Sequence, residues 1–172
     1  ASDNLRIAQV ALWTTPPPSY TKQTTEPWSV PYSGPERTDI DTTTLAGKVL
    51  CGYQGWFNTP HDGQSRGWVH WSNDSNQMNA SNVIFDMWPE LDEYPESELA
   101  PTGILNADSS TARLYTGIGD GVVRRHFRWM RQYGIDGVFL SRFISVPSVD
   151  PEGFRHNNLN VAQVRDGAHR EG

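Results

Sequence analysis

The chain has little cysteine and no long hydrophobic run. Cys51 is the only cysteine among 172 residues, so an internal disulfide and a zinc site built from several thiolates are excluded. Because Cys51 lies in a short apolar run, we favour a buried structural thiol over a reactive one. No segment approaches the roughly 20 consecutive apolar residues that a membrane-spanning helix needs. We therefore expect no membrane partner.

Positive charge is also scarce. Lysine and arginine number 14 against 20 aspartates and glutamates, and the formal net charge is −6. A nucleic-acid partner needs a basic stripe that neutralises phosphates, which this sequence lacks. The five histidines are scattered and no calcium-loop pattern occurs, so we expect no metal site and no cofactor. A neutral or weakly charged ligand fits this balance better.

Tryptophan, by contrast, is abundant. Four of the seven tryptophans fall between Trp56 and Trp88, in a stretch that also contains His70. Aromatic faces stack on the C–H surfaces of sugar rings, so the cluster favours carbohydrate binding. Large aromatic side chains also simply fill cores. Both interpretations stay open for the cluster.

Residues 1–46 are expected to form an extended leader or linker. Three successive prolines at 16–18 end any regular structure there, and Pro27, Pro31 and Pro35 follow at regular spacing. This composition favours a polyproline-like or irregular strap laid across the surface. The ordered domain is expected to occupy residues 47–172.

Short apolar runs bounded by glycine predict the elements of that domain. We expect strands at 48–53, 83–85 and 138–140, and long polar loops at 54–81 and 86–116. Val123, Phe127 and Met130 recur at helical spacing and predict a helix over 121–133, with Asp120 as its N-cap and Gly134 as its stop. A weaker helix is expected over 158–171. This alternation implies parallel β/α units, and a further strand is expected after Gly172.

Three groups of charged residues have an ordinary interpretation beside a functional one. The predicted helix carries four arginines that suit a solvated face better than an anion site: Arg124, Arg125, Arg128 and Arg131. The second loop carries acids that suit a solvated loop better than a catalytic pair: Glu90, Asp92, Glu93, Glu96 and Glu98. Asp62, next to His61, fits either a substrate hydrogen bond or an ordinary turn.

Several motifs resemble the N-terminal signature of glycoside hydrolase family 71/99-like proteins, which include endo-α-mannosidases and endo-α-mannanases. The resemblance is carried by GYQGWFNTP at 52–60, by GWVHW at 67–71, by MWPEL at 87–91 and by the run from His126 to Phe139. It covers roughly residues 45–172. Where well-studied members have a Ser-Trp-Trp sequence, this chain has Ser141, Arg142 and Phe143, so an arginine donor replaces a stacking surface.

The resemblance implies an α/β fold, namely the N-terminal portion of a (β/α)8 TIM barrel with long βα loops behind the Pro-rich leader. A full barrel takes about 250 residues, so we expect only two or three of its strands here. The chain would then be a fragment, half of a split barrel whose remainder is its partner, or a degenerate domain. Unpaired strand edges would make it prone to association. The resemblance also leads us to expect an extracellular or periplasmic location.

Position and resemblance together give five candidate sugar-binding residues: Tyr53, Trp56, His70, Trp71 and Arg142. The tryptophans would stack on sugar rings, while the other three would hydrogen-bond, Arg142 to an acidic or sulfated sugar. His70 fits a structural role equally well. In the family the catalytic glutamates lie near a later strand, so none is assigned here.

Two functions remain open, with a purely structural domain as a weaker third. One is part of a glycoside hydrolase cleaving a mannose-like or related glycan, and the other is a non-catalytic carbohydrate-binding module. A carboxylate pair encoded beyond Gly172 would favour the enzyme. From this chain alone we expect no glycosidase turnover.

Overall fold

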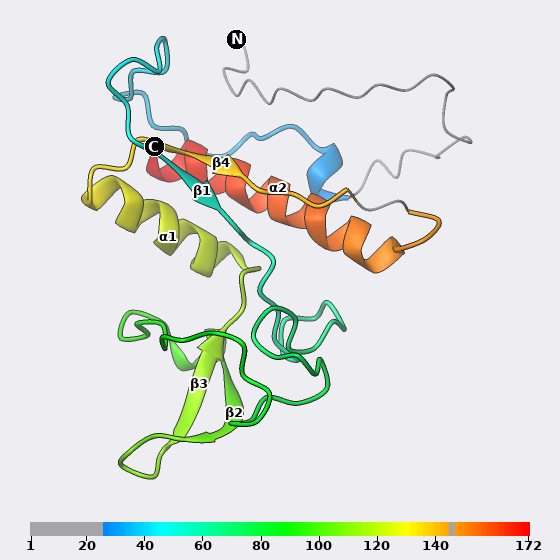
Figure 1. Ribbon diagram of the computed structural model, residues 1–172. Helices are drawn as coiled ribbons and strands as arrows, with labels where there is room; N and C mark the ends of the chain where they lie inside the picture. Colours follow the sequence, from blue (N-terminus) through cyan, green and yellow to red (C-terminus); the bar gives the residue numbers. More distant parts are fainter. Residues whose placement is uncertain (1–25, 145–146) are drawn as a thin grey trace.

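A computed structural model describes residues 26–144 and 147–172 (Figure 1). Within these residues the strands are β1 (Leu50–Tyr53), β2 (Leu99–Leu105), β3 (Thr111–Tyr115) and β4 (Gly137–Leu140). The helices are α1 (Asp120–Gln132) and α2 (Pro151–Glu171), with short 3-10 turns η1 (Pro27–Ser29) and η2 (Glu96–Glu98). The predicted strand at 83–85 is wrong, because Val83 makes only an isolated bridge to Ser72.

β1 and β4 form a two-stranded parallel sheet, with α1 in the connection between them. Leu50 pairs with Gly137 at one end and Tyr53 with Leu140 at the other. The Ser141 amide donates to the Tyr53 carbonyl at 2.8 Å, which extends the pairing by one residue. The predicted strand–helix–strand unit is therefore confirmed for this segment.

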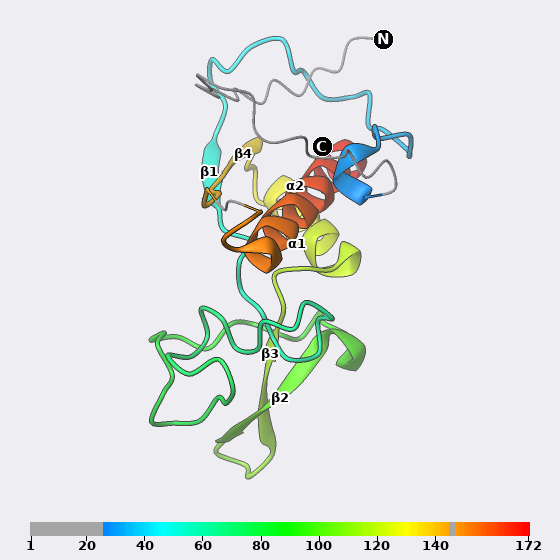
Figure 2. The ribbon, with the colours of Figure 1, turned by 90° about the vertical axis from the view of Figure 1, so that its right-hand side faces the viewer.

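Both long helices pack on the same face of this sheet, as Figure 2 shows. Strand side chains alternate in direction, and Tyr53, Val138 and Leu140 pack with Val123 and Phe127 of α1. α2 adds Val164 and Ala168 to this cluster. Cys51, half-buried rather than buried, has its sulfur 3.8 Å from that of Met130. The opposite face is open, and Phe139 is 65% exposed there.

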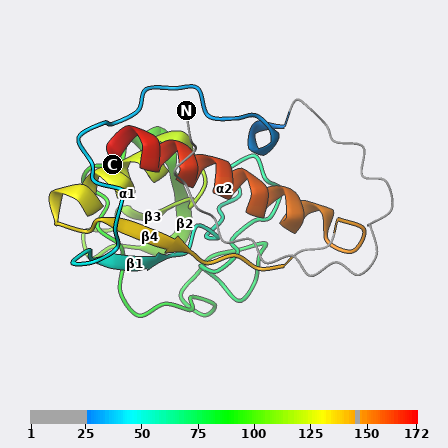
Figure 3. The same cartoon turned by 90° about the horizontal axis from the view of Figure 1, so that it is seen from above.

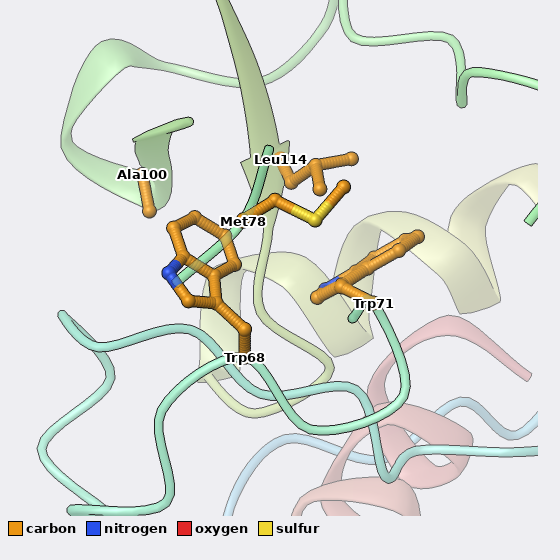
Figure 4. Close-up of a cluster of buried hydrophobic side chains, with 5 residues drawn as sticks. All are labelled: Trp68, Trp71, Met78, Ala100 and Leu114. Carbon is orange, nitrogen blue, oxygen red and sulfur yellow. The ribbon is translucent and has the colours of Figure 1, made fainter. Parts of the chain in front are cut away.

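Residues 54–118 form a second lobe, inserted between β1 and α1 (Figure 1). Its core is a cluster of Trp68, Trp71, Met78, Ala100 and Leu114, in which the loop tryptophans pack against the antiparallel hairpin of β2 and β3 (Figure 4). The expectation of one continuous loop at 86–116 is therefore wrong. Its acidic start, together with Pro101 and Gly103 inside β2, concealed the hairpin, whose register shifts between Pro101 and Leu105.

The helix boundaries differ from the expected ones. α1 contains Asp120 in its first turn, with Gly119 rather than Asp120 in the N-cap position, while Gly134 follows with a φ of +74° as predicted. α2 starts at Pro151, well before the expected residue 158, and the Asp150 carboxylate caps it by accepting from the Gly153 amide at 2.8 Å. Gly167 lets the two helices approach closely, since an added Cβ would lie 3.0 Å from the Phe127 ring.

Residues 26–46 run along α2 on the side away from the sheet (Figure 3). Arg165 of α2 donates to the Val30 carbonyl at 2.8 Å, and Tyr32 stacks on His169 with ring centroids 4.3 Å apart. The Arg37 amide donates to the His169 carbonyl. This part of the predicted leader is thus an irregular strap, whereas residues 1–25 lie outside the described residues.

Candidate functional site

A small hollow lies where β1 and β4 end, and it leaves no room for a water molecule. It is lined by Gly55, Trp56, Leu140, Ser141, Arg142, Asn157 and Asn160, from the two strand ends and from α2. Ligands of parallel α/β folds bind at the carboxyl ends of the strands. Two predicted candidates, Trp56 and Arg142, line this hollow, and a third, His70, lies beside Trp56.

Three aromatic rings, which we call the aromatic surface, border the hollow. The Trp56 ring stacks on Phe143 at a centroid distance of 4.7 Å and lies 5.4 Å from His70. The rings of His70 and Phe143 are nearly parallel, at 3°. Phe143 is 54% exposed and Trp56 is half-buried, so part of this surface is open to a ligand.

His70 adopts an unusual backbone conformation, with a φ of +64°. It stands within a turn in which the Trp71 amide donates to the Trp68 carbonyl, and both tryptophans are buried in the lobe core. The left-handed backbone conformation of His70 lets its ring lie against Trp56 while the next residue, Trp71, points into the core of the lobe. Burial, and secondly the charge of Arg66, lower the pKa of His70. A neutral imidazole can both donate and accept a hydrogen bond.

The other two candidates, Tyr53 and Trp71, are not brought to the aromatic surface. Trp71 is 4% exposed, its indole N–H donates to the Tyr115 carbonyl at 3.0 Å, and Phe57 and Phe85 pack against its ring. Tyr53 is buried between the sheet and α1. In the described chain both side chains serve packing.

The Tyr53 hydroxyl belongs to a buried network centred on His126 of α1. It lies 2.9 Å from His126 Nδ1, and the Tyr94 hydroxyl lies 2.6 Å from Nε2. Burial, and secondly Arg125, lower the pKa of His126 to about 4, while burial raises the pKa of both tyrosines. All three groups are therefore neutral at pH 7. The network ties β1 and the inserted lobe to α1.

The polar wall of the hollow comes from asparagines near the start of α2. The Arg142 guanidinium donates to Asn158 Oδ1 at 2.6 Å, and Asn157 Nδ2 donates to the Phe143 carbonyl at 3.1 Å. Asn160 is 5% exposed, and its Nδ2 has no hydrogen-bond partner among the described residues. Partial burial lowers the pKa of Arg142 from its very high ordinary value, which leaves the guanidinium charged.

Gly55 makes the approach between the β1 end and α2 possible. A Cβ at this position would lie 1.9 Å from Asn160 Nδ2 and 2.5 Å from its Cγ. Any larger residue would therefore displace the Asn160 amide from the wall of the hollow. This glycine is required for space, because its φ does not lie in the left-handed region.

Asp62 holds a second buried network, in the loop that follows β1. Its Oδ2 accepts from Asn58 Nδ2 at 2.8 Å and from the Thr116 hydroxyl at 3.0 Å. Asn58 Nδ2 also lies 3.2 Å from His156 Nδ1, which must then accept, so His156 carries its proton on Nε2. Burial, and secondly Arg66, lower the pKa of His156 to about 4, against the opposing effect of Asp62. The Asp62 carboxylate is therefore already hydrogen-bonded within the protein, where it stabilises the loop that follows β1.

A larger cavity, of about 450 Å³, lies between the inserted lobe and the start of α1. Asp62, Glu96 and Glu98 contribute carboxylates to its wall. Glu98 pairs with Arg125 at 2.6 Å and Glu96 with Arg113 at 2.8 Å, while Asp62 is held as above. Since each of these three carboxylates already has a partner, the described lining of this cavity offers no evident acid–base pair.

Sequence reasoning missed four residues of the site: Phe143, Asn157, Asn158 and Asn160. Phe143 was visible only as a departure from the family motif. The asparagines had a readable signal, because three of them within four residues are unfavourable in a helix interior. Their burial in α2 marks a polar contact that the helix retains at a cost.

Comparison with known protein families, curated proteins and solved structures finds no match to this chain. Within residues 26–144 and 147–172, no group of three or more histidine, cysteine, aspartate or glutamate side chains is arranged to hold a metal ion. In the same residues no helix is both long and apolar enough to cross a membrane.

Proposed function

We propose that the aromatic surface, together with the Arg142 guanidinium beside it, binds a carbohydrate. The observation that carries the proposal is the pairing of exposed ring area on Trp56 and Phe143 with the exposed guanidinium of Arg142. Sugar sites combine an apolar stacking face with a few placed polar groups. The position at the carboxyl ends of parallel strands supports a ligand site.

We further propose that the chain is the N-terminal portion of a (β/α)8 barrel related to family 71/99 glycoside hydrolases. Its substrate would be a mannose-like or related glycan. The parallel pairing of β1 with β4, the two helices on one face and the long excursion after β1 support this architecture. The open face around Phe139 would then face the barrel interior. A catalytic carboxylate pair would come from later strands.

A non-catalytic carbohydrate-binding module is the alternative. One observation favours it: among the described residues, none that lines the hollow carries a carboxylate. Glycosidic cleavage takes two carboxyl groups on either side of the bond. The two functions share the same binding surface and differ in turnover alone.

Binding of the purified chain to a panel of immobilised glycans tests the proposal, with Trp56→Ala as the informative variant. Loss of a stacking ring at the centre of a site typically costs about 2 kcal/mol, or roughly 30-fold in Kd. Trp88→Ala is the matched control, because Trp88 is 38% exposed and lies in the inserted lobe against Arg113. Binding that survives Trp56→Ala, or no binding to any glycan, would sink the proposal.

A further inference from the structure

The cavity between the inserted lobe and the start of α1 is too large to be a packing defect. Its volume is about 450 Å³, whereas protein interiors leave few voids larger than a water molecule and one water needs only roughly 10–15 Å³. Small-molecule sites measure roughly 300–1,000 Å³ and often lie where two domains meet. The size and the position of this cavity are those of such a site.

The walls of the cavity are held in place by packing on both sides. Ala100 of β2 and Val122 of α1 line it, and each is 1% exposed. The lobe is fastened to α1 by the ion pair between Glu98 and Arg125 at 2.6 Å and by the buried network centred on His126. The cavity is therefore formed before any ligand enters, which lowers the entropic cost of binding.

Thr59 gives an independent sign of a ligand. It lies in the loop that follows β1, lines the cavity and is 2% exposed. Its amide donates to Asp62 Oδ2 at 3.2 Å, while its hydroxyl has no hydrogen-bond partner among the described residues. This hydroxyl is not one of the fully enclosed polar atoms without a partner, so it is reached from the cavity. Because buried hydroxyls are normally hydrogen-bonded, a polar ligand in the cavity would complete it.

The charged groups of the lining exclude an anion. Glu96 and Glu98 contribute carboxylates that are paired with Arg113 and Arg125, and Asp62 contributes a third carboxylate. Among the described residues that line the cavity, none is a lysine or an arginine. An anionic ligand would face these carboxylates with no cation in the lining to bind it. Since two of the three carboxylates are already neutralised, a neutral ligand suits the cavity best.

Aliphatic and hydroxyl groups share the rest of the lining. Leu99, Ile118 and Val122 provide C–H surface, while Thr59 and Ser97 provide hydroxyls. This mixture matches a molecule that carries hydroxyls around an apolar ring, as a pyranose does. No phenylalanine, tyrosine or tryptophan is found among the described lining residues, so the cavity differs from the aromatic surface in chemistry as well as in position.

We propose that this cavity is a second binding site, which takes a neutral sugar of monosaccharide or disaccharide size and hydrogen-bonds one of its hydroxyls through Thr59. The inference goes beyond the glycan site at the aromatic surface, because the two sites share no residue and either can exist without the other. A sugar in the cavity would contact both the inserted lobe and α1.

Nuclear magnetic resonance of the isotope-labelled chain, titrated with neutral sugars, tests the proposal. The probes are glucose, mannose, galactose, maltose and cellobiose, together with the uronate of each monosaccharide. We expect at least one neutral sugar to shift the signals of Thr59, Ile118 and Val122 in a saturable way at millimolar concentration. The matching uronate should bind about tenfold more weakly, because the lining offers it no cation.

Three variants locate the effect. Thr59→Val keeps the shape and removes the hydroxyl, so it should weaken binding about fivefold. Thr111→Val is the matched control, because it removes an exposed hydroxyl of the same lobe outside the cavity and should leave the affinity unchanged. Ser97 is exposed and lines the cavity, so Ser97→Phe should fill part of the space at little cost in folding and abolish binding.

The failures of the two sites are separable. No saturable binding of any neutral probe, equal affinity for the uronate, or full binding by Ser97→Phe and Thr59→Val overturns the cavity site and leaves the aromatic surface standing. Trp56→Ala should weaken glycan binding at the aromatic surface and leave the cavity unaffected, and loss of both would show one site rather than two. Cavity binding without any Trp56-dependent glycan binding sinks the proposed function alone. Circular dichroism and urea midpoints confirm that folded variants are compared.

Discussion

Gly55→Ala is expected to destabilise the chain by pushing Asn160 away from β1. The new methyl would lie 1.9 Å from Asn160 Nδ2 and 2.5 Å from Cγ, well inside van der Waals contact. Overpacking of this kind costs about 1–3 kcal/mol. For a chain of this size, 1 kcal/mol corresponds to about 2–4 °C in Tm. We therefore expect the Tm to fall by roughly 2–12 °C.

Urea unfolding followed by tryptophan fluorescence measures this loss, with Gly52→Ala as the matched control. Gly52 lies three residues earlier in β1, and an added Cβ there meets no atom within 4 Å. Replacement of glycine in a strand removes backbone entropy from the unfolded chain, so the control should be neutral or stabilising by up to about 1 kcal/mol.

A double-mutant cycle with Asn160→Ala isolates the contact. Truncating Asn160 removes the atoms that the new methyl meets, so Gly55→Ala should cost much less in that background. We expect a coupling free energy of about 1–2 kcal/mol. Strict additivity, or a Gly55→Ala variant as stable as the wild type, would refute the packing described for Gly55 and Asn160.

The free energy of unfolding should fall as the pH drops from about 6.5 toward 4. Burial lowers the pKa of His126 and of His156 to about 4 in the folded chain, so the unfolded chain binds protons first. Each histidine contributes up to about 1.4 kcal/mol per pH unit in that window, and urea midpoints that do not change between pH 7 and pH 4.5 would contradict buried neutral histidines. Trp71→Ala should cost about 3–5 kcal/mol of stability, because the ring is buried. Trp56→Ala should cost clearly less, and the reverse order of denaturation midpoints would show that the two tryptophans are wrongly placed. His70→Gly should leave the free energy of unfolding within about 1 kcal/mol of the wild type, since glycine tolerates the φ of +64°. The same substitution should weaken glycan binding, and unchanged glycan affinity would remove His70 from the site. Incubation of the purified chain with α-mannan should release no reducing ends, and measurable hydrolysis would reassign the catalytic groups to this chain.

The regular elements around the sheet were the predictable part of the fold. The continuous apolar run at 138–140 and the helical spacing of Val123, Phe127 and Met130 are local signals, and β4 and α1 occur where they indicate. The hairpin was concealed because its burial pattern depends on the loop tryptophans that cover it. The start of α2 was concealed by asparagines, which are poor helix formers whose contacts lie in another element.

The residues of the candidate site also differ in whether a local sequence signal or long-range packing places them. Trp56 and Arg142 follow strands directly in the sequence, so topology alone places them at one edge of the sheet. Trp71 carries the same sequence signal as Trp56, and only the packing of the inserted lobe decides that one is buried and the other half-exposed. Asn160 is distant in sequence and meets Gly55 only through the approach of α2.

Nuclear magnetic resonance with an oligosaccharide identified from the glycan panel tests the central claim most directly. The indole N–H signals of the tryptophans and the ring signals of His70 would be followed during titration. We expect Trp56 and His70 to shift in a saturable way while Trp68 and Trp71, buried in the lobe core, stay unchanged. Saturable binding that leaves Trp56 and His70 unmoved would contradict a carbohydrate site at the carboxyl ends of β1 and β4.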